Sequence, residues 1–186
     1  HLLQIFRRTA VSFKTIYDGA RDHPSRPAIV HNGSVISYAA FATAIDATCH
    51  YLEAEELPVG QTVIVMIHNL ADCWVAVLAL QALGLNTVCV RSSPVIETLA
   101  LNKVVGIVTT EREAPELQLE SDARTCNRVV TIPNPGYGGD ELPVGPTFKG
   151  NTEIGGHILY TSGTTGSYKK LFFSADLIQR CSAERS

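Results

Sequence analysis

The sequence lacks a long apolar run and any block of like charge. Its longest apolar stretch, residues 74–85, is interrupted by Gln81, and a bilayer span needs about 20 apolar residues. The net charge of -3 shows none of the basic excess typical of surfaces that bind nucleic acids or anionic membranes. Arg7 and Arg8 interrupt the apolar N-terminal residues, which is not typical of a secretory signal. These absences predict a cytoplasmic protein with no membrane span and no nucleic-acid partner.

Cysteines are few and scattered. Five are present, and no two of them form a C-x-x-C pair. Cys49 and His50 are the one close pair of possible zinc ligands, whereas a structural zinc site usually needs four clustered Cys or His side chains. We therefore expect no metal site and interpret the cysteines as reduced, buried thiols. They are Cys49, Cys73, Cys89, Cys126 and Cys181.

What the sequence does contain is an alternation of short apolar runs with segments of helical periodicity. An apolar share of 45% over 186 residues is enough for one globular core. Strand, helix, strand is the order typical of a parallel sheet with crossover helices. Strands are expected at 62–69, 86–91, 104–110, 128–133 and 157–161, and helices at 12–23, 38–57, 71–84 and 93–103.

Turn signals add further features. Asn32-Gly33 joins two β-rich runs and predicts a type I′ hairpin, because both residues tolerate positive φ. Residues 111–155 contain five of the nine prolines and are expected to be loop-rich. Ser174 is expected to cap a further helix. The predicted fold class is α/β, a parallel-rich sheet with crossover helices and an N-terminal β-hairpin, in a single domain over residues 1–186.

A segment rich in hydroxyl groups and glycine, residues 160–170, follows the last predicted strand. Ligands usually bind at the carboxyl ends of strands in parallel sheets. Glycines let consecutive N–H groups face one anion, hydroxyls donate to phosphate oxygens, and Lys169 adds a positive charge. The spacing differs from a Walker A loop, and Tyr160 stands where a nucleophile elbow needs glycine. On the residues alone, this segment is either an anion-binding loop or a solvated connector.

The run "YTSGTTGSYK" resembles the phosphate-binding signature of the adenylate-forming superfamily, Tyr/Phe-Thr-Ser-Gly-Thr-Thr-Gly-x-Pro-Lys-Gly. Eight positions match, from Tyr160 to Gly166 plus Lys169. Tyr168 replaces the usual proline and Lys170 the usual glycine. This superfamily includes acyl-CoA synthetases, luciferases and the adenylation domains of peptide synthetases.

The resemblance extends upstream of this signature. Residues 34–69 are similar to an early block of the family in which an apolar strand ends in Asn, here Asn69. Residues 74–90 are similar to the next block, where a helix end leads into a strand. The fold implied is therefore the first part of the large N-terminal domain of adenylate-forming enzymes.

Members of the superfamily use ATP and Mg2+ to activate a carboxylic acid as an acyl-adenylate, releasing pyrophosphate. Most then transfer the acyl group to coenzyme A or to a phosphopantetheine carrier. The resemblance assigns no catalytic residue and no metal ligand to this chain, so we expect the 186 residues alone to be inactive. The residues that it assigns to ATP phosphates and pyrophosphate are Thr161, Ser162, Gly163, Thr164, Thr165, Gly166 and Lys169.

Two other interpretations stay open. One is a different nucleotide-using α/β enzyme, and the other is a non-catalytic binding or interaction module derived from an adenylating enzyme. Among the remaining side chains, His157 is interpreted as a neutral residue at a strand start, Trp74 as core, and residues 111–113 as a solvated turn. His68, at a strand end, is given at most a minor role at the ligand side.

Overall fold

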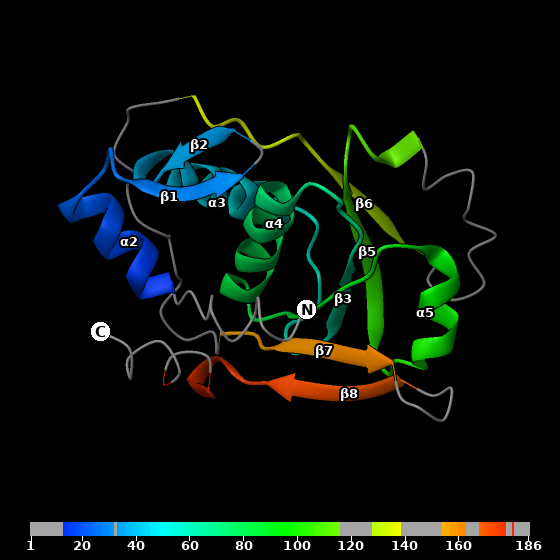
Figure 1. The fold of residues 1–186 in the computed structure, drawn as a ribbon. Helices are drawn as coiled ribbons and strands as arrows, with labels where there is room; N and C mark the ends of the chain where they lie inside the picture. The colour runs from blue at the N-terminus through cyan, green and yellow to red at the C-terminus, as the bar shows by residue number, and fades with distance from the viewer. Residues whose placement is uncertain are drawn as a thin grey trace.

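The computed structural model describes residues 13–31, 33–115, 128–138, 154–162, 168–177 and 180. These residues form a six-stranded sheet and a separate two-stranded sheet, with helices between and around them (Figure 1). The strand order in the larger sheet is β6-β5-β3-β4-β7-β8. Its strands are β3 (Thr62–Val65), β4 (Asn86–Cys89), β5 (Val104–Thr110), β6 (Val129–Ile132), β7 (His157–Ser162) and β8 (Tyr168–Phe173).

Five of these six strands run in the same direction. β3 pairs in parallel with β4 and β5, β5 with β6, and β4 with β7, whereas β8 is antiparallel to β7. The carboxyl ends of the five parallel strands therefore lie along one edge of the sheet, together with the amino end of β8. This topology confirms the predicted α/β class with its parallel-rich sheet.

Helices cover both faces of the larger sheet. Helices α3 (Tyr38–Glu53) and α4 (Leu70–Ala82) contribute to one buried cluster, with α2 (Phe13–Asp22) packed beside α3. Helix α5 (Ser93–Leu99) contributes to a second buried cluster. In the described part of the chain, no helix is both long and apolar enough to span a bilayer.

The apolar sequence of β3 follows from its central position. Successive side chains of a strand point to opposite faces of a sheet. Val63 and Val65 belong to the cluster formed with α3 and α4, whereas Ile64 belongs to the cluster formed with α5. All three side chains are fully buried, as expected for a parallel strand covered on both faces.

The predicted hairpin is confirmed. Strands β1 (Pro27–His31) and β2 (Ser34–Ser37) are antiparallel, and His31 pairs with Ser34. Gly33 has a φ of 77°, the left-handed conformation that a tight hairpin turn requires. Asn32 lies outside the described residues.

Side-chain caps mark the starts of α3 and α4, and some of the predicted element boundaries differ from those in the structure. Ser37 accepts a hydrogen bond from the backbone N–H of Ala40 at the start of α3, and Asn69 accepts from two backbone N–H groups at the start of α4. The helix predicted over 38–57 ends at Glu53. The strand predicted over 62–69 ends at Val65, because the residues after it lead into the Asn69 cap.

The element that follows the hydroxyl-rich segment is a strand, β8, which the sequence pattern did not predict. β8 pairs along β7 from His157↔Phe173 to Ser162↔Tyr168. Leu177 N–H donates to Ser174 Oγ at 3.3 Å, so the expected serine cap is present, but it lies at the far end of β8. This helical turn therefore follows the end of β8 that pairs with His157, whereas Ser162 pairs with the opposite end of the strand.

Three of the five cysteines are described. Cys49, Cys73 and Cys89 are half-buried free thiols, and burial raises the pKa of the Cys49 thiol to about 12. The Sγ atoms of Cys73 and Cys89 lie 3.5 Å apart. These three cysteines form no disulfide, but they are half-buried rather than buried as predicted. Cys126 and Cys181 lie outside the described residues.

Gly155 lies in close backbone contact with the end of α4 just before β7 begins, and a substitution there tests whether this contact contributes to stability. Gly155 N–H donates to the carbonyl of Gln81 at 2.8 Å, and a Cβ at this position would overlap the carbonyl oxygen of Leu85. We expect Gly155→Ala to lower the free energy of unfolding by about 3 kcal/mol, at the upper end of overpacking costs. Urea denaturation measures the change. Gly136→Ala is the matched control, because a Cβ there meets nothing within 4 Å; equal effects of the two substitutions would contradict the packing argument.

Burial of the neutral His157 side chain leads us to expect that the protein loses stability in acid. The His157 side chain is 2% exposed, and burial lowers its pKa to about 4, which agrees with the predicted neutral residue at a strand start. An unfolded histidine has a pKa of about 6.5, so the unfolded state binds the additional proton between these two values. Stability therefore falls as the pH drops from about 6.5 to about 4, by on the order of 3 kcal/mol from this residue.

Equilibrium unfolding across this pH range tests the assignment. His157→Gln removes the titrating group, and its unfolding free energy should depend less on pH than that of the wild type. His23→Gln is the control, because His23 is exposed. A wild-type pH dependence retained in full by His157→Gln would show that another group is responsible.

Candidate functional site

Three of the seven predicted site residues, Thr161, Ser162 and Lys169, are described, and they lie at the carboxyl edge of the parallel strands. Thr161 and Ser162 are the last two residues of β7. Lys169, on β8, pairs directly with Thr161, so both side chains lie on the same face of the sheet. The other predicted site residues lie outside the described residues, and they are Gly163, Thr164, Thr165 and Gly166.

The two consecutive lysines of β8 have different environments. Lys170 Nζ donates to the carbonyl oxygens of Leu99 at 2.8 Å and Ala100 at 3.0 Å. These carbonyls lie at the end of α5, where a positive charge is favourable. Lys169 is exposed, and within the described part of the chain its ammonium group makes no hydrogen bond or ion pair. Because neighbouring residues of a strand face opposite sides, Lys169 stays available for a ligand while Lys170 caps a helix.

Tyr168 also makes a structural contact. Its ring packs edge-on against the ring of Tyr160, with centroids 5.3 Å apart and an interplanar angle of 89°. Both tyrosines pack against the buried cluster that includes α5. The two departures from the adenylate-forming signature, Tyr168 and Lys170, are therefore accommodated by contacts on the α5 face of the sheet.

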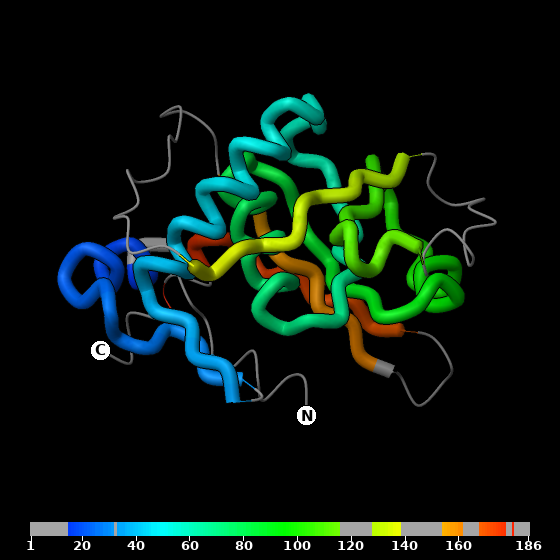
Figure 2. Tube along the Cα trace, turned by 90° about the horizontal axis from the view of Figure 1, so that it is seen from above, coloured from blue at the N-terminus to red at the C-terminus, as the bar shows by residue number. Residues whose placement is uncertain are grey.

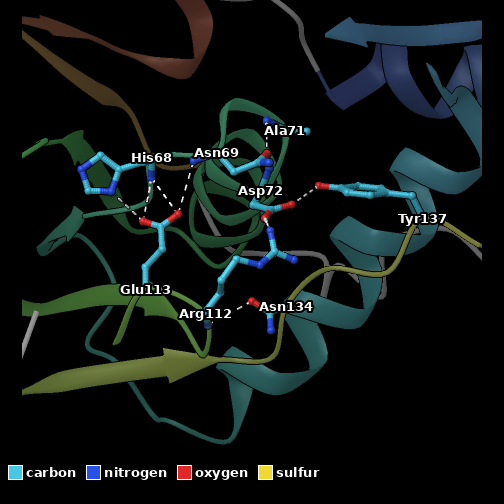
Figure 3. Close-up of polar contacts among 8 residues, drawn as sticks. All are labelled: His68, Asn69, Ala71, Asp72, Arg112, Glu113, Asn134 and Tyr137. Carbon is cyan, nitrogen blue, oxygen red and sulfur yellow. Dashed lines mark hydrogen bonds and ion pairs between the residues drawn. The ribbon is translucent and has the colours of Figure 1, made fainter. Parts of the chain in front are cut away.

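A second group of polar side chains lies at the same edge (Figure 3). The Glu113 carboxylate, in the turn after β5, accepts from His68 N–H at 3.0 and 2.8 Å and from Asn69 N–H at 3.3 Å. Its side chain is only 13% exposed. Glu113 therefore places a negative charge where α4 begins, and the N-terminal end of a helix carries a partial positive charge.

The His68 ring joins the ends of three strands. Its Nδ1 lies 2.9 Å from Glu113 Oε2, and its Nε2 lies 3.0 Å from the backbone oxygen of Arg91. A carbonyl oxygen accepts hydrogen bonds only, as does an ionised carboxylate, so both ring nitrogens carry protons when both bonds form. The hydrogen bond to Glu113 is the largest influence that raises the pKa of His68. The His68 ring thus links the segments that follow β3, β4 and β5.

Asp72 forms the other half of this polar group (Figure 3). Its carboxylate is buried in the first turn of α4, where it accepts from Tyr137 Oη at 2.6 Å. Arg112 Nη1 lies 3.6 Å from the other oxygen, and Arg112 N–H donates to Asn134 at 3.2 Å. Residues 133–138 run from β6 back past α4 and α3 (Figure 2), which brings Tyr137 to this carboxylate.

The interpretation of residues 111–113 as a solvated turn is wrong for Glu113, whereas Glu111 and Arg112 are exposed. The backbone does turn here, but Glu113 is largely buried and Arg112 bridges to Asp72. A signal was present in the sequence, since these charges directly follow a buried parallel strand. Their partners, in contrast, come from sequence-distant segments that only the fold brings together. Trp74 is half-buried against the core, in agreement with its interpretation.

The bond between Glu113 and His68 predicts a measurable titration. We expect the His68 ring protons, followed by NMR, to titrate with a pKa above about 6.5. Glu113→Gln removes the carboxylate and should lower that pKa toward the unperturbed value. Glu111→Gln, at an exposed side chain, is the control and should leave it unchanged.

The sign of the linked effect on stability follows from the direction of the pKa shift. A raised pKa means that the stabilising contribution of His68 is complete below about pH 6.5 and is lost as the pH rises through the folded-state pKa. An identical His68 titration in the wild type and in Glu113→Gln would contradict the assigned contact.

Comparison with known proteins identifies the fold. No family model and no curated protein matches this chain. The fold is that of the N-terminal region of adenylate-forming enzymes, as the sequence resemblance predicts.

Three solved structures illustrate the similarity. The nonribosomal peptide synthetase FmoA3, bound to α-methyl-L-serine-AMP, matches with a TM-score of 0.63 and 19% identity, over 91% of this chain and 19% of that chain. The N-terminal subdomain of Klebsiella oxytoca NpsA, in complex with 3-hydroxybenzoyl-AMSN, matches with a TM-score of 0.62 and 20% identity, over 86% and 40%. The inhibitor-bound N-terminal domain of FACL13 from Mycobacterium tuberculosis matches with a TM-score of 0.63 and 17% identity, over 88% and 44%. This chain thus spans less than half of each structure.

Proposed function

We propose that this chain is the N-terminal portion of an ATP-dependent ligase that activates a carboxylic acid as an acyl-adenylate. A thioester to coenzyme A or to a phosphopantetheinyl carrier protein would follow. The observation that carries this proposal is the ordered signature "YTSGTTGSYK" at the carboxyl end of β7, in a chain with the fold of adenylate-forming enzymes. Neither the signature nor the fold would carry it alone, because folds host many functions.

Formation of an acyl-adenylate requires a group that binds the departing pyrophosphate. When a carboxylate attacks the α-phosphate, negative charge must be stabilised on the β- and γ-phosphates. We assign this role to the loop between β7 and β8, with hydroxyls from Thr161, Ser162, Thr164 and Thr165. Gly163 and Gly166 would let the backbone approach the phosphates. Lys169 would supply the positive charge, and its exposed position beside Thr161 supports this role.

Mg2+ would enter with the nucleotide as part of the substrate. Among the described residues, no three His, Cys, Asp or Glu side chains are grouped closely enough to hold a metal ion. We therefore assign no metal ligand to this part of the chain. The groups that bind adenine and ribose, and the catalytic lysine, would come from the remainder of the polypeptide, as the resemblance implies.

A non-catalytic module derived from an adenylating enzyme is the second candidate. Tyr168 and Lys170 favour it, because they depart from the signature. However, both side chains have structural partners on the α5 face, and Lys169 remains without one among the described residues. The changes at Tyr168 and Lys170 therefore do not remove the positive charge of Lys169, which the proposed chemistry needs.

Lys169 and Lys170 offer a matched pair of substitutions in the full-length protein. We expect Lys169→Ala to weaken ATP binding roughly 10- to 100-fold, the loss expected for a hydrogen bond to a charged group. Lys170→Ala removes the same charge from the neighbouring position and should leave ATP affinity within about twofold, while lowering the melting temperature through loss of the α5 cap. Calorimetric titration with ATP measures the first effect and thermal unfolding the second. Unchanged ATP affinity and adenylation rate in Lys169→Ala would remove Lys169 from the site.

The isolated 186 residues are expected to show no acid-dependent exchange of pyrophosphate into ATP, because the proposed site is incomplete without the rest of the polypeptide. The full-length protein serves as the positive control in the same assay. Clear exchange by the isolated chain would overturn this expectation.

A further inference from the structure

We propose that Arg91 is a second phosphate-binding cation, which acts with Lys169 from the opposite side of β7. The inference rests on the proposed function and adds to it a residue outside the signature loop. It comes from the pairing of three adjacent strands, β4, β7 and β8, at the carboxyl edge of the sheet.

Strand register places Arg91 next to the start of the hydroxyl-rich segment. β4 and β7 are parallel neighbours, with Val88 opposite Ile158. Continuing this register by three residues along each strand brings Arg91 level with Thr161. β4 ends at Cys89, but Val90 N–H still donates to the Val65 carbonyl at 3.0 Å, so the backbone follows the sheet as far as Val90, the residue before Arg91.

Lys169 lies on the other side of the same residue. Thr161 pairs with Lys169 across β7 and β8, and the extended register of β4 would place Arg91 on the other side of Thr161. Neighbouring strands are about 4.8 Å apart, which puts the Cα atoms of the two cations roughly 10 Å from one another. Long side chains from two such positions can contact different phosphoryl groups of a single pyrophosphate or triphosphate.

The Arg91 side chain is available for a ligand. It is exposed, and within the described part of the chain its guanidinium makes no hydrogen bond or ion pair. Burial raises the pKa of Tyr160, and the positive charge of Arg91 opposes that rise, which agrees with a guanidinium close to the end of β7. Among the described residues, therefore, neither Arg91 nor Lys169 has a side-chain partner.

The backbone of Arg91 is held in place while its side chain stays exposed. His68 Nε2 contacts the Arg91 carbonyl oxygen at 3.0 Å, and His68 Nδ1 contacts Glu113 at 2.9 Å. These contacts fix the segment after β4 relative to the ends of β3 and β5. A cation on a fixed backbone loses less conformational freedom on binding than one on an unrestrained loop.

A guanidinium suits this position chemically. Pyrophosphate carries several negative charges on adjacent phosphoryl groups, and one ammonium group leaves much of that charge unneutralised. Arginine presents five N–H donors in a planar fork and binds phosphate oxygens in a bidentate manner, which lysine cannot reproduce. Arg91 would therefore contribute both charge and orientation to the bound phosphates.

Calorimetric titration of the full-length protein with inorganic pyrophosphate tests the inference. We expect Arg91→Ala to weaken binding about 10-fold or more, Arg91→Lys to have an intermediate affinity, and the effect to shrink at high salt because electrostatic attraction is screened. Arg26→Ala is the matched control, since Arg26 is an exposed arginine that precedes β1 in the other sheet. Thermal unfolding of each variant verifies that the fold is retained.

The outcomes separate the two proposals. If Lys169→Ala weakens pyrophosphate binding while Arg91→Ala binds as the wild type does, the inference about Arg91 is wrong and the proposed function stands. If Arg91→Ala and Arg26→Ala weaken binding equally, the effect of Arg91 is one of net charge and the inference is again wrong. If the wild type does not bind pyrophosphate, the proposed function itself is wrong. Unchanged pyrophosphate affinity in Lys169→Ala removes Lys169 from the site and contradicts the pairing of Arg91 with Lys169.

Discussion

The parallel pairing of β7 with β4 determines where the candidate site lies, and it joins segments some seventy positions apart in the chain. Close backbone approach makes this pairing possible, since there is no room for a Cβ on Gly155 or Gly156. Polar contacts then fix the register: the half-buried Asn86 side chain accepts from Gly156 N–H at 2.9 Å, and the buried Thr87 Oγ1 lies 2.8 Å from His157 Nδ1. If these contacts at the amino end of β7 shifted by one residue, every side chain at its carboxyl end would change face.

Charge distribution along the carboxyl edge follows from the same topology. Ends of parallel strands gather side chains from distant parts of the sequence, and here they divide into two groups. Glu113, His68 and the Asp72 group satisfy one another and hold the turns after the strands. Lys169 and Arg91, at the β4–β7–β8 side, keep their charges exposed. At this edge the charges of Glu113, His68 and Asp72 are therefore paired within the protein, whereas those of Lys169 and Arg91 are exposed. The part of the edge with the two exposed cations is the part suited to an anionic ligand.

The sequence predicted the parts of the fold that depend on local chemistry. Alternation of apolar runs with helical periodicity located β5 at exactly its observed bounds, residues 104–110, and Asn32-Gly33 located the hairpin. β8 was missed because "YKKLFF" has its apolar residues at one end, without the alternation of a half-buried strand. Four of its six residues are exposed, so tertiary pairing with β7, rather than burial, defines that strand. Glu113 and Asp72 could not be assigned either, because their roles depend on partners that only the fold supplies.

The signature is better understood as a set of geometric requirements than as a string of residues. In the superfamily pattern a proline and a glycine stand where this chain has Tyr168 and Lys170, and their loss removes one restricted φ and one permissive residue. Here the same segment is the start of an antiparallel strand, whose pairing restricts the backbone without proline. The edge-on contact of Tyr168 with Tyr160 and the bonds from Lys170 to the end of α5 add side-chain restraints of their own. Position 169 therefore keeps its register with Thr161 although both of its neighbours differ from the pattern, so the pairing of these two residues does not depend on the proline and the glycine.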